Sequence, residues 1–179
     1  MRRLRKQCIG LGLFAALTVC TAMSATDDDE MAFATGRHMT SAVLNRAYTA
    51  DHVANLVYEV YKGRVVFHAG DAELAPGLSV HHVGGHTKGL QVVRVRTRVG
   101  WLVLASDATH YYENMETCRP YATAYDLGAM VEAFRRLNEL AESLEHIVPG
   151  HDPLVMERYP PVSDDLKGIA VRLDVKHGG

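Results

Sequence analysis

The sequence predicts one layered α/β domain. Short apolar, β-branched runs lie between residues 65 and 106, and two amphipathic helical patterns, at 40–61 and 126–144, flank them. A length of 179 residues suits one domain with a sizeable core and is too short for two. The hydrophobic fraction of 47% and the net charge of -2 are typical of a globular protein and give no reason to expect a nucleic-acid or anionic-membrane partner.

Residues 1–25 are predicted to be separate from the domain, which would occupy 26–179. A basic start, an apolar run at 9–19 and the small residues at 21–25 have the order of a signal peptide. The apolar run is shorter than the ~20 residues that cross a bilayer, so no stable membrane span is expected. A cleaved signal would place the protein in the periplasm or outside the cell, whereas a spurious start would leave it in the cytoplasm.

The first helical pattern covers 40–61. Its apolar residues recur at helical spacing and are Val53, Leu56, Val57, Val60 and Tyr61. Thr49 or Asp51 could cap the start of this pattern, and Gly63 is placed to end it.

Strands are predicted at 65–68, 78–83, 91–97 and 101–106, with turns at 70–71, 75–77 and 98–100. The stretch 107–125 is irregular and predicts a loop with some short helix. A second helix is expected over 126–144, with one apolar face made of Leu127, Met130, Val131, Phe134, Leu137, Leu140, Ala141 and Leu144. A short strand at 146–148 and a last amphipathic element at 165–175 complete the prediction.

Three side chains that can bind a metal follow predicted strands. His86 follows two glycines, Asp107 follows the 101–106 strand, and His151 follows Pro149-Gly150. Imidazole and carboxylate are the usual ligands of catalytic zinc, and one sheet could bring all three to a common edge. Singly, each has an ordinary alternative as a turn residue or a helix cap, but the three together predict a metal site.

Other chemistry-bearing residues have ordinary explanations. Cys118 is the one cysteine outside 1–25, which excludes a disulfide within the domain, and we expect it to be buried or half-buried. His81 and His82 alternate along a strand, so one of them is expected to face solvent. Four tyrosines could line a substrate pocket or simply pack a surface loop: Tyr111, Tyr112, Tyr121 and Tyr125.

Three motifs carry a family resemblance. Gly85-His86-Thr87-x-Gly89, Ser106-Asp107-Ala108 and Pro149-Gly150-His151-Asp152 resemble the third, fourth and fifth metal motifs of the metallo-β-lactamase superfamily. The wider context from 74–77 through 112–114 is similar to its N-acyl homoserine lactonase branch, although glyoxalase II relatives share the ligand pattern. The resemblance covers about residues 30–160. It implies an αββα sandwich and metal-dependent opening of a lactone ring.

The resemblance also implies roles for single residues. His86 would bind one zinc ion, Asp107 would bridge two, and His151 would bind the second, so that an activated water attacks the lactone carbonyl. Lactonases often carry a tyrosine three residues after the bridging aspartate. This sequence has His110 there, which could donate a hydrogen bond to the substrate in the same way.

One motif of the family is missing. The string H-x-H-x-D-H occurs nowhere in the sequence, so most of the first half of the sandwich is expected to be absent. We therefore predict at most one weak zinc site and little or no activity from the isolated chain. One alternative is a non-catalytic half-domain that pairs with a complementing half or dimerises through its open sheet edge. Another is that the gene start is misassigned.

Overall fold

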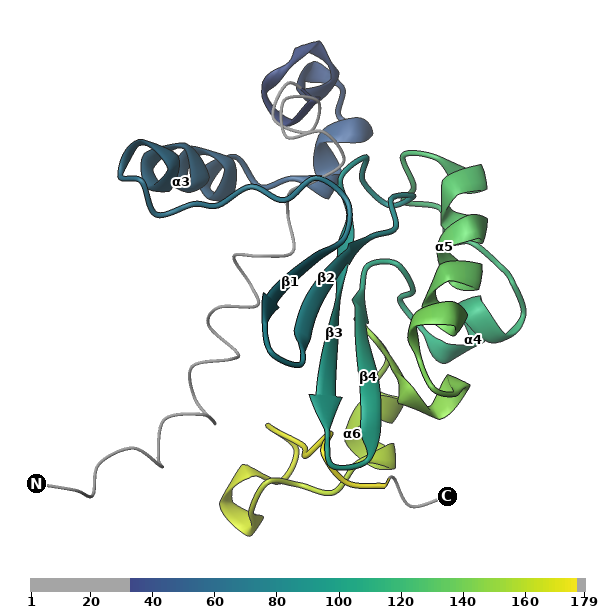
Figure 1. Ribbon diagram of the computed structural model, residues 1–179. Helices are drawn as coiled ribbons and strands as arrows, with labels where there is room; N and C mark the ends of the chain where they lie inside the picture. Colours follow the sequence, from purple (N-terminus) through teal and green to yellow (C-terminus); the bar gives the residue numbers. More distant parts are fainter. Residues whose placement is uncertain (1–32, 177–179) are drawn as a thin grey trace, which may run out of the picture.

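A five-stranded sheet is the centre of the computed structural model, which describes residues 33–176 (Figure 1). Its strands are β1 (Ala72–Ala75), β2 (Leu78–His82), β3 (Gln91–Thr97), β4 (Gly100–Ser106) and β5 (Ile147–Pro149), in the order β1-β2-β3-β4-β5. The first four strands pair antiparallel, and β5 pairs parallel with β4. The predicted segment 1–25 lies outside the described residues.

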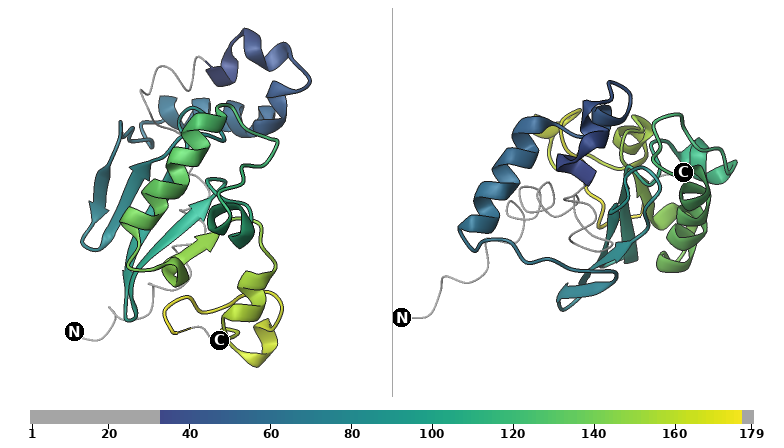
Figure 2. Two further views of the ribbon diagram at one scale, coloured as in Figure 1. Left: turned by 90° about the vertical axis from the view of Figure 1, so that its right-hand side faces the viewer. Right: turned by 90° about the horizontal axis from the view of Figure 1, so that it is seen from above.

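The helices surround this sheet. They are η1 (Arg37–Thr40), η2 (Leu44–Ala47), α3 (Ala50–Tyr61), α4 (Tyr112–Glu116), α5 (Leu127–Leu140), η3 (Leu144–His146), α6 (Leu154–Arg158) and η4 (Asp164–Leu166). Figure 2 shows α5 lying along one face of the sheet, with α3 on the other side and away from the strands. Across residues 33–176, no helix combines the length and the apolar character needed to span a membrane.

The core lies mainly between the sheet and α5. On this face of the sheet the side chains of Val92 and Val103 are fully buried, because their β3 and β4 positions point at the helix. Alternation along β4 sends Leu102 to the opposite face, where it packs in a smaller cluster with Val148 and Tyr159. Both sheet faces around β4 are therefore covered, as the continuous apolar run of this strand predicts.

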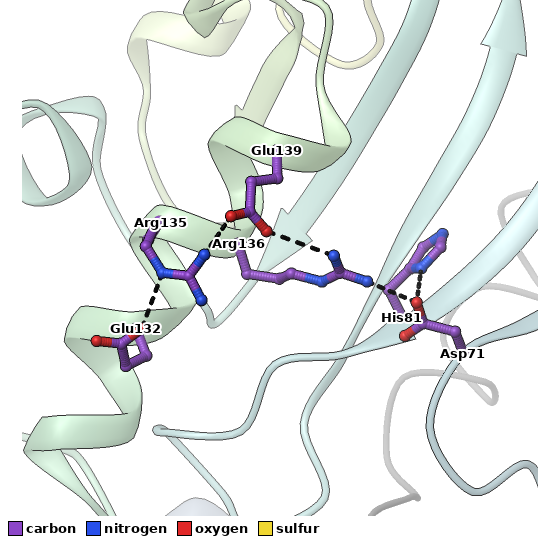
Figure 3. Close-up of polar contacts among 6 residues, drawn as sticks. All are labelled: Asp71, His81, Glu132, Arg135, Arg136 and Glu139. Carbon is purple, nitrogen blue, oxygen red and sulfur yellow. Dashed lines mark hydrogen bonds and ion pairs between the residues drawn. The ribbon is translucent and has the colours of Figure 1, made fainter.

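A chain of charges also joins α5 to the edge of the sheet (Figure 3). Arg136 Nη2 lies 2.6 Å from Asp71 Oδ2, and the same oxygen lies 2.9 Å from His81 Nδ1 on β2. Glu139 continues the chain along the helix by pairing with both Arg136 and Arg135. This network ties the polar side of α5 to the residue that precedes β1.

The helical pattern at 40–61 is only partly confirmed. Tyr48 and Thr49 have extended backbones, so the stretch divides into short 3-10 turns and the twelve-residue helix α3. The end of α3 is as predicted: Gly63 takes φ +67°, and the Arg64 amide donates to the Glu59 carbonyl across it. No residue of Ala50–Tyr61 is buried, so its apolar stripe is at most half-covered.

Two expected elements are absent from the described part of the chain. Residues 65–68 form no strand, and Val66 is exposed; the carbonyls of His68 and Gly70 instead accept hydrogen bonds from the Gln91 side chain. The stretch 165–175 contains no regular element beyond the end of η4. It is irregular, with one isolated bridge between Pro161 and Val171, and Val171 and Leu173 pack against the cluster of Leu102.

Three smaller predictions are also wrong. The second helix, α5, ends at Leu140 instead of Leu144, because Ala141 has an extended backbone. Cys118 is exposed, at a turn with φ +53° that follows α4. Neither His81 nor His82 faces solvent, since the first contacts Asp71 and Ser79 and the second contacts the Lys88 carbonyl.

Candidate metal centre

The parallel pairing of β4 and β5 positions two of the predicted ligands. The two strands end side by side, so Asp107 after β4 and His151 after β5 leave the same edge of the sheet. A Cβ atom on Gly150 would lie 2.6 Å from the Ser106 carbonyl oxygen, so only glycine permits this approach. Ser106 itself has φ +47°, which turns the chain sharply into Asp107.

Backbone hydrogen bonds then hold the two loops together. The Gly150 amide donates to the Thr109 carbonyl, and the His151 amide donates to the His110 carbonyl, both at 3.0 Å. Asp152 fixes the loop from the other side, because its buried carboxylate accepts from the Tyr112 and Leu154 amides at 2.9 Å. His110 and His151 are therefore adjacent through main-chain contacts that do not depend on their rings.

Three side chains converge at this edge. His151 Nε2 lies 2.7 Å and His110 Nε2 lies 3.2 Å from the same oxygen, Asp107 Oδ1. One ligand atom from each of Asp107, His110 and His151 lies within 4.8 Å of the other two. The structure thus joins two of the predicted metal ligands with His110, which the sequence suggested for contact with the substrate.

His86 lies beside this group. Gly85, which precedes it, has φ +90°, and a Cβ there would lie 2.7 Å from Met130 Cα, so the turn packs directly on the start of α5. His86 Nδ1 lies 2.7 Å from the Thr123 carbonyl, an acceptor, so Nδ1 carries the proton and Nε2 has a free lone pair. Its ring centroid is 5.8 Å from that of His110.

Tyr121 covers the other side of the group. Its ring stacks on His110 with centroids 3.5 Å apart and planes at 15°, and its hydroxyl donates to the Asp107 carbonyl. Burial raises the pKa of the Tyr121 hydroxyl, which keeps it a neutral donor. Burial lowers the pKa of His110, and the neighbouring Asp107 carboxylate raises it by less, so the net change is downward. A lowered pKa favours the neutral imidazole, which is the form that binds metals.

The four predicted pocket tyrosines have different environments. A cavity of about 270 Å³ adjoins His86 and Thr123, and only Tyr125 of the four lines it, together with Phe33 and Leu44. Tyr112 is buried in the core, where burial raises its pKa to about 12 and the Arg158 guanidinium lies 3.7 Å above its ring. Tyr111 is exposed. Of the two alternatives for these tyrosines, lining of this cavity therefore applies to Tyr125 alone.

Side chains of this chemistry at this spacing could hold a metal ion. Zinc ligands lie about 2.1 Å from the ion in a tetrahedron, so pairs of ligand atoms are roughly 3.4 Å apart. Separations of 2.7 and 3.2 Å, with all three atoms within 4.8 Å, are close to that spacing. Two imidazoles and one carboxylate also leave a fourth position open for substrate or water.

The residues that orient the group are not apparent from the sequence. Tyr121 contacts Asp107, Thr123 contacts His86, and Asp152 contacts Tyr112. The two partners of each contact are between 14 and 40 residues apart in the chain. Asp152 stands next to His151 in a recognisable motif, which was an available signal. Tyr121 and Thr123 lie in an irregular loop, where no periodicity indicates which way a side chain points.

Comparison with known proteins gives a partial match. No protein-family model matches the chain. An N-acyl homoserine lactonase from Bacillus sp is 33% identical over 100 residues, which are 55% of this chain and 37% of that protein. An N-acyl homoserine lactonase from Bacillus cereus is 32% identical over the same length and shares. The chain thus spans 37% of the length of the curated relatives that it matches.

A solved structure shows the same fold over a longer stretch. It is AidC, a dizinc quorum-quenching lactonase in complex with a product, and it matches 73% of this chain and 47% of its own length. The TM-score is 0.52 at 13% sequence identity, so this likeness concerns the fold. The sheet with helices on its face is accordingly part of a metallo-β-lactamase fold.

Proposed function

We propose that this chain, a member of the N-acyl homoserine lactonase-like branch of the metallo-β-lactamase superfamily, is a metal-dependent hydrolase of a lactone ring. The observation that carries the proposal is the convergence of Asp107, His110 and His151 at the edge of the sheet. One independent finding agrees with it, namely the relatives that bear the name of lactonases. The donor set itself, two imidazoles and one carboxylate, suits zinc.

The family pattern would assign His86, Asp107 and His151 to zinc; here Asp107 and His151 meet, and His86 lies beside them. Asp107 and His110 would lie next to a bound lactone. A bound zinc ion supplies a Lewis acid that polarises a carbonyl and lowers the pKa of a water. Asp107 contributes the negative charge that holds a cation at this edge, and Tyr121 orients it through the main-chain carbonyl. The side chains of His110 and His151, 22% and 56% exposed, leave the centre open to substrate.

The substrate class follows from the surface next to the centre. The cavity beside His86 is lined on one side by apolar side chains of Phe33, Val43 and Leu44. A lactone whose ring lies at Asp107 and whose acyl chain extends past His86 would bury that chain in the cavity. This placement agrees with an N-acyl homoserine lactone, the substrate named for the relatives.

Ring opening of N-hexanoyl homoserine lactone by the purified chain tests the proposal. We expect a slow rate that zinc increases and a chelator abolishes, because three side chains give a bound ion few protein ligands. Asp107→Asn should reduce the zinc-dependent rate to background, while Asp165→Asn, on the distant η4, should leave it unchanged. An equal rate with zinc and with chelator would contradict the hydrolase and favour the non-catalytic half-domain.

A further inference from the structure

We propose that His110 is itself a metal ligand, and that Asp107, His110 and His151 together hold one zinc-like divalent cation. This inference rests on the proposed metal-dependent function and deepens it. His110 then binds the ion and does not donate a hydrogen bond to the substrate. His86 is not among the ligands of this ion.

His110 Nε2 is buried and makes an ion-pair contact with Asp107 Oδ1 at 3.2 Å. It forms no well-aligned hydrogen bond with any group of residues 33–176. Buried polar atoms in native proteins are almost always satisfied, and an ion is one of the partners that explain an exception. A cation between Asp107 and the two rings would satisfy this nitrogen.

The His110 ring is held in place by its neighbours. Tyr121 stacks on it with ring centroids 3.5 Å apart, and the His151 ring lies T-shaped to it with centroids 4.5 Å apart. The His110 carbonyl also accepts from the His151 amide, which fixes the main chain below the ring. A ligand that is already oriented loses little conformational entropy when it binds a metal.

His110 belongs to the cluster of ligand atoms, and His86 does not. The ligand atoms that lie within 4.8 Å of one another belong to Asp107, His110 and His151. His86 is outside that group, and its Nδ1 contact with the Thr123 carbonyl holds its ring beside the group. The three-residue set therefore binds the ion without a contribution from His86.

Zinc titration of four full-length proteins tests this assignment by calorimetry. His110→Phe keeps an aromatic ring to stack on Tyr121 but removes both nitrogens. His86→Phe is the matched comparison, and His52→Phe, on the exposed side of α3, is the control. We expect about one zinc per wild-type chain, a loss of roughly 100-fold or more in affinity for His110→Phe, and changes below about threefold for the other two.

A measurement on the unmutated protein avoids any effect of substitution on folding. Nitrogen-15 spectra of the histidine rings should show the Nε2 resonances of His110 and His151 both shifting on addition of zinc. Wild-type affinity in His110→Phe, or an unmoved His110 resonance while zinc binds, would overturn the inference and leave the proposed hydrolase intact. Failure of the wild-type chain to bind zinc at all would overturn both.

Discussion

At the scale of single residues, the candidate site depends on two glycines, at positions where a Cβ atom would clash with a neighbouring segment. The β4 and β5 exits can approach only because Gly150 leaves room for the Ser106 carbonyl, and the His86 turn can reach α5 only because Gly85 has no Cβ. Ser106 adopts φ +47° at the same place, a backbone conformation that is costly for a residue with a side chain. Such strain is typical of functional sites.

Gly150→Ala tests the importance of this contact. The new Cβ would lie 2.6 Å from the Ser106 oxygen, so the strands must separate, and we expect a loss of about 1–3 kcal/mol in the free energy of unfolding. The shift should also displace His151 and weaken zinc binding. Gly63→Ala is the control, since it has φ +67° and no neighbour within 4 Å; it should cost roughly 1–2 kcal/mol while zinc affinity is retained. Equal zinc affinity in the two variants would contradict the argument.

At the scale of elements, α5 links the core to the site. Its inner face is buried against β3 and β4, and Asp126 at its start caps the helix by accepting from the Ala129 amide at 2.9 Å. The amides of Tyr125 and Asp126 also donate to the Gly85 carbonyl, directly before His86. Burial of the helix therefore also places the His86 turn.

Two leucines of α5 give a matched test of this burial. Leu137 is fully buried, so Leu137→Ala should lower the free energy of unfolding by about 2–5 kcal/mol. Leu127 lies on the same helix with 58% of its surface exposed, and Leu127→Ala should change stability by less than about 0.5 kcal/mol. Denaturant unfolding followed by circular dichroism measures both. Similar losses for the two variants would show that α5 is not packed as described.

The charge network at the edge of α5 predicts a dependence on pH. Burial alone would raise the pKa of Asp71, but the contacts with His81 and Arg136 outweigh it and hold the pKa below 3.8. A carboxylate with a depressed pKa stabilises the fold fully above its unfolded pKa, and this contribution is lost as the pH falls through the folded pKa.

Asp71→Asn should therefore lower the stability at pH 7 by about 0.2–1 kcal/mol, since the pair is partly exposed. The difference from wild type should shrink as the pH falls below 3.8. Melting temperatures of both proteins between pH 7 and 3 measure this, with Asp165→Asn as a control. A difference that grows toward low pH would have the wrong sign.

At the scale of the whole molecule, metal binding and folding should be coupled. The cluster joins residues from both sides of α4 and α5, so a bound ion favours the folded state over the unfolded chain. The sheet edge at β1 is only four residues long, and pairing or dimerisation through that edge remains a prediction. The use of residues 1–25 as an export signal is likewise a prediction.

Removal of metal measures this coupling. Free zinc at about 100 times its dissociation constant should stabilise the fold by about 2.7 kcal/mol, which corresponds to roughly 5–10 °C in the melting temperature. Differential scanning calorimetry with zinc and with a chelator checks the shift, and Asp107→Asn should abolish it. An identical melting temperature under both conditions would contradict a metal site in the folded chain.

Strands and helices were predicted best where apolar residues recur at the spacing of a strand or a helix over many positions. The runs at 91–97 and 101–106 became β3 and β4, and the stripe at 126–144 became α5, because burial of one face fixes the periodicity. The two expected elements that are absent from the described part of the chain lie at 65–68 and 165–175, where no ladder forms beyond one isolated bridge between Pro161 and Val171. Whether an apolar run pairs with another strand depends on segments far away in the chain. The periodicity of the run holds no information about those segments.

The amino-acid sequence alone was enough to indicate the metal-binding residue types, the strand exits that carry Asp107 and His151, and the resemblance to lactonases. Those features are local, because a glycine turn or a ligand after a strand is recognised from its neighbours in the chain. The tertiary structure decided that His110 joins Asp107 and His151, that His86 lies beside them, and that Tyr121 orients the group. These contacts depend on β4 and β5 pairing in parallel and on loops meeting across them, and chain order does not specify such distances.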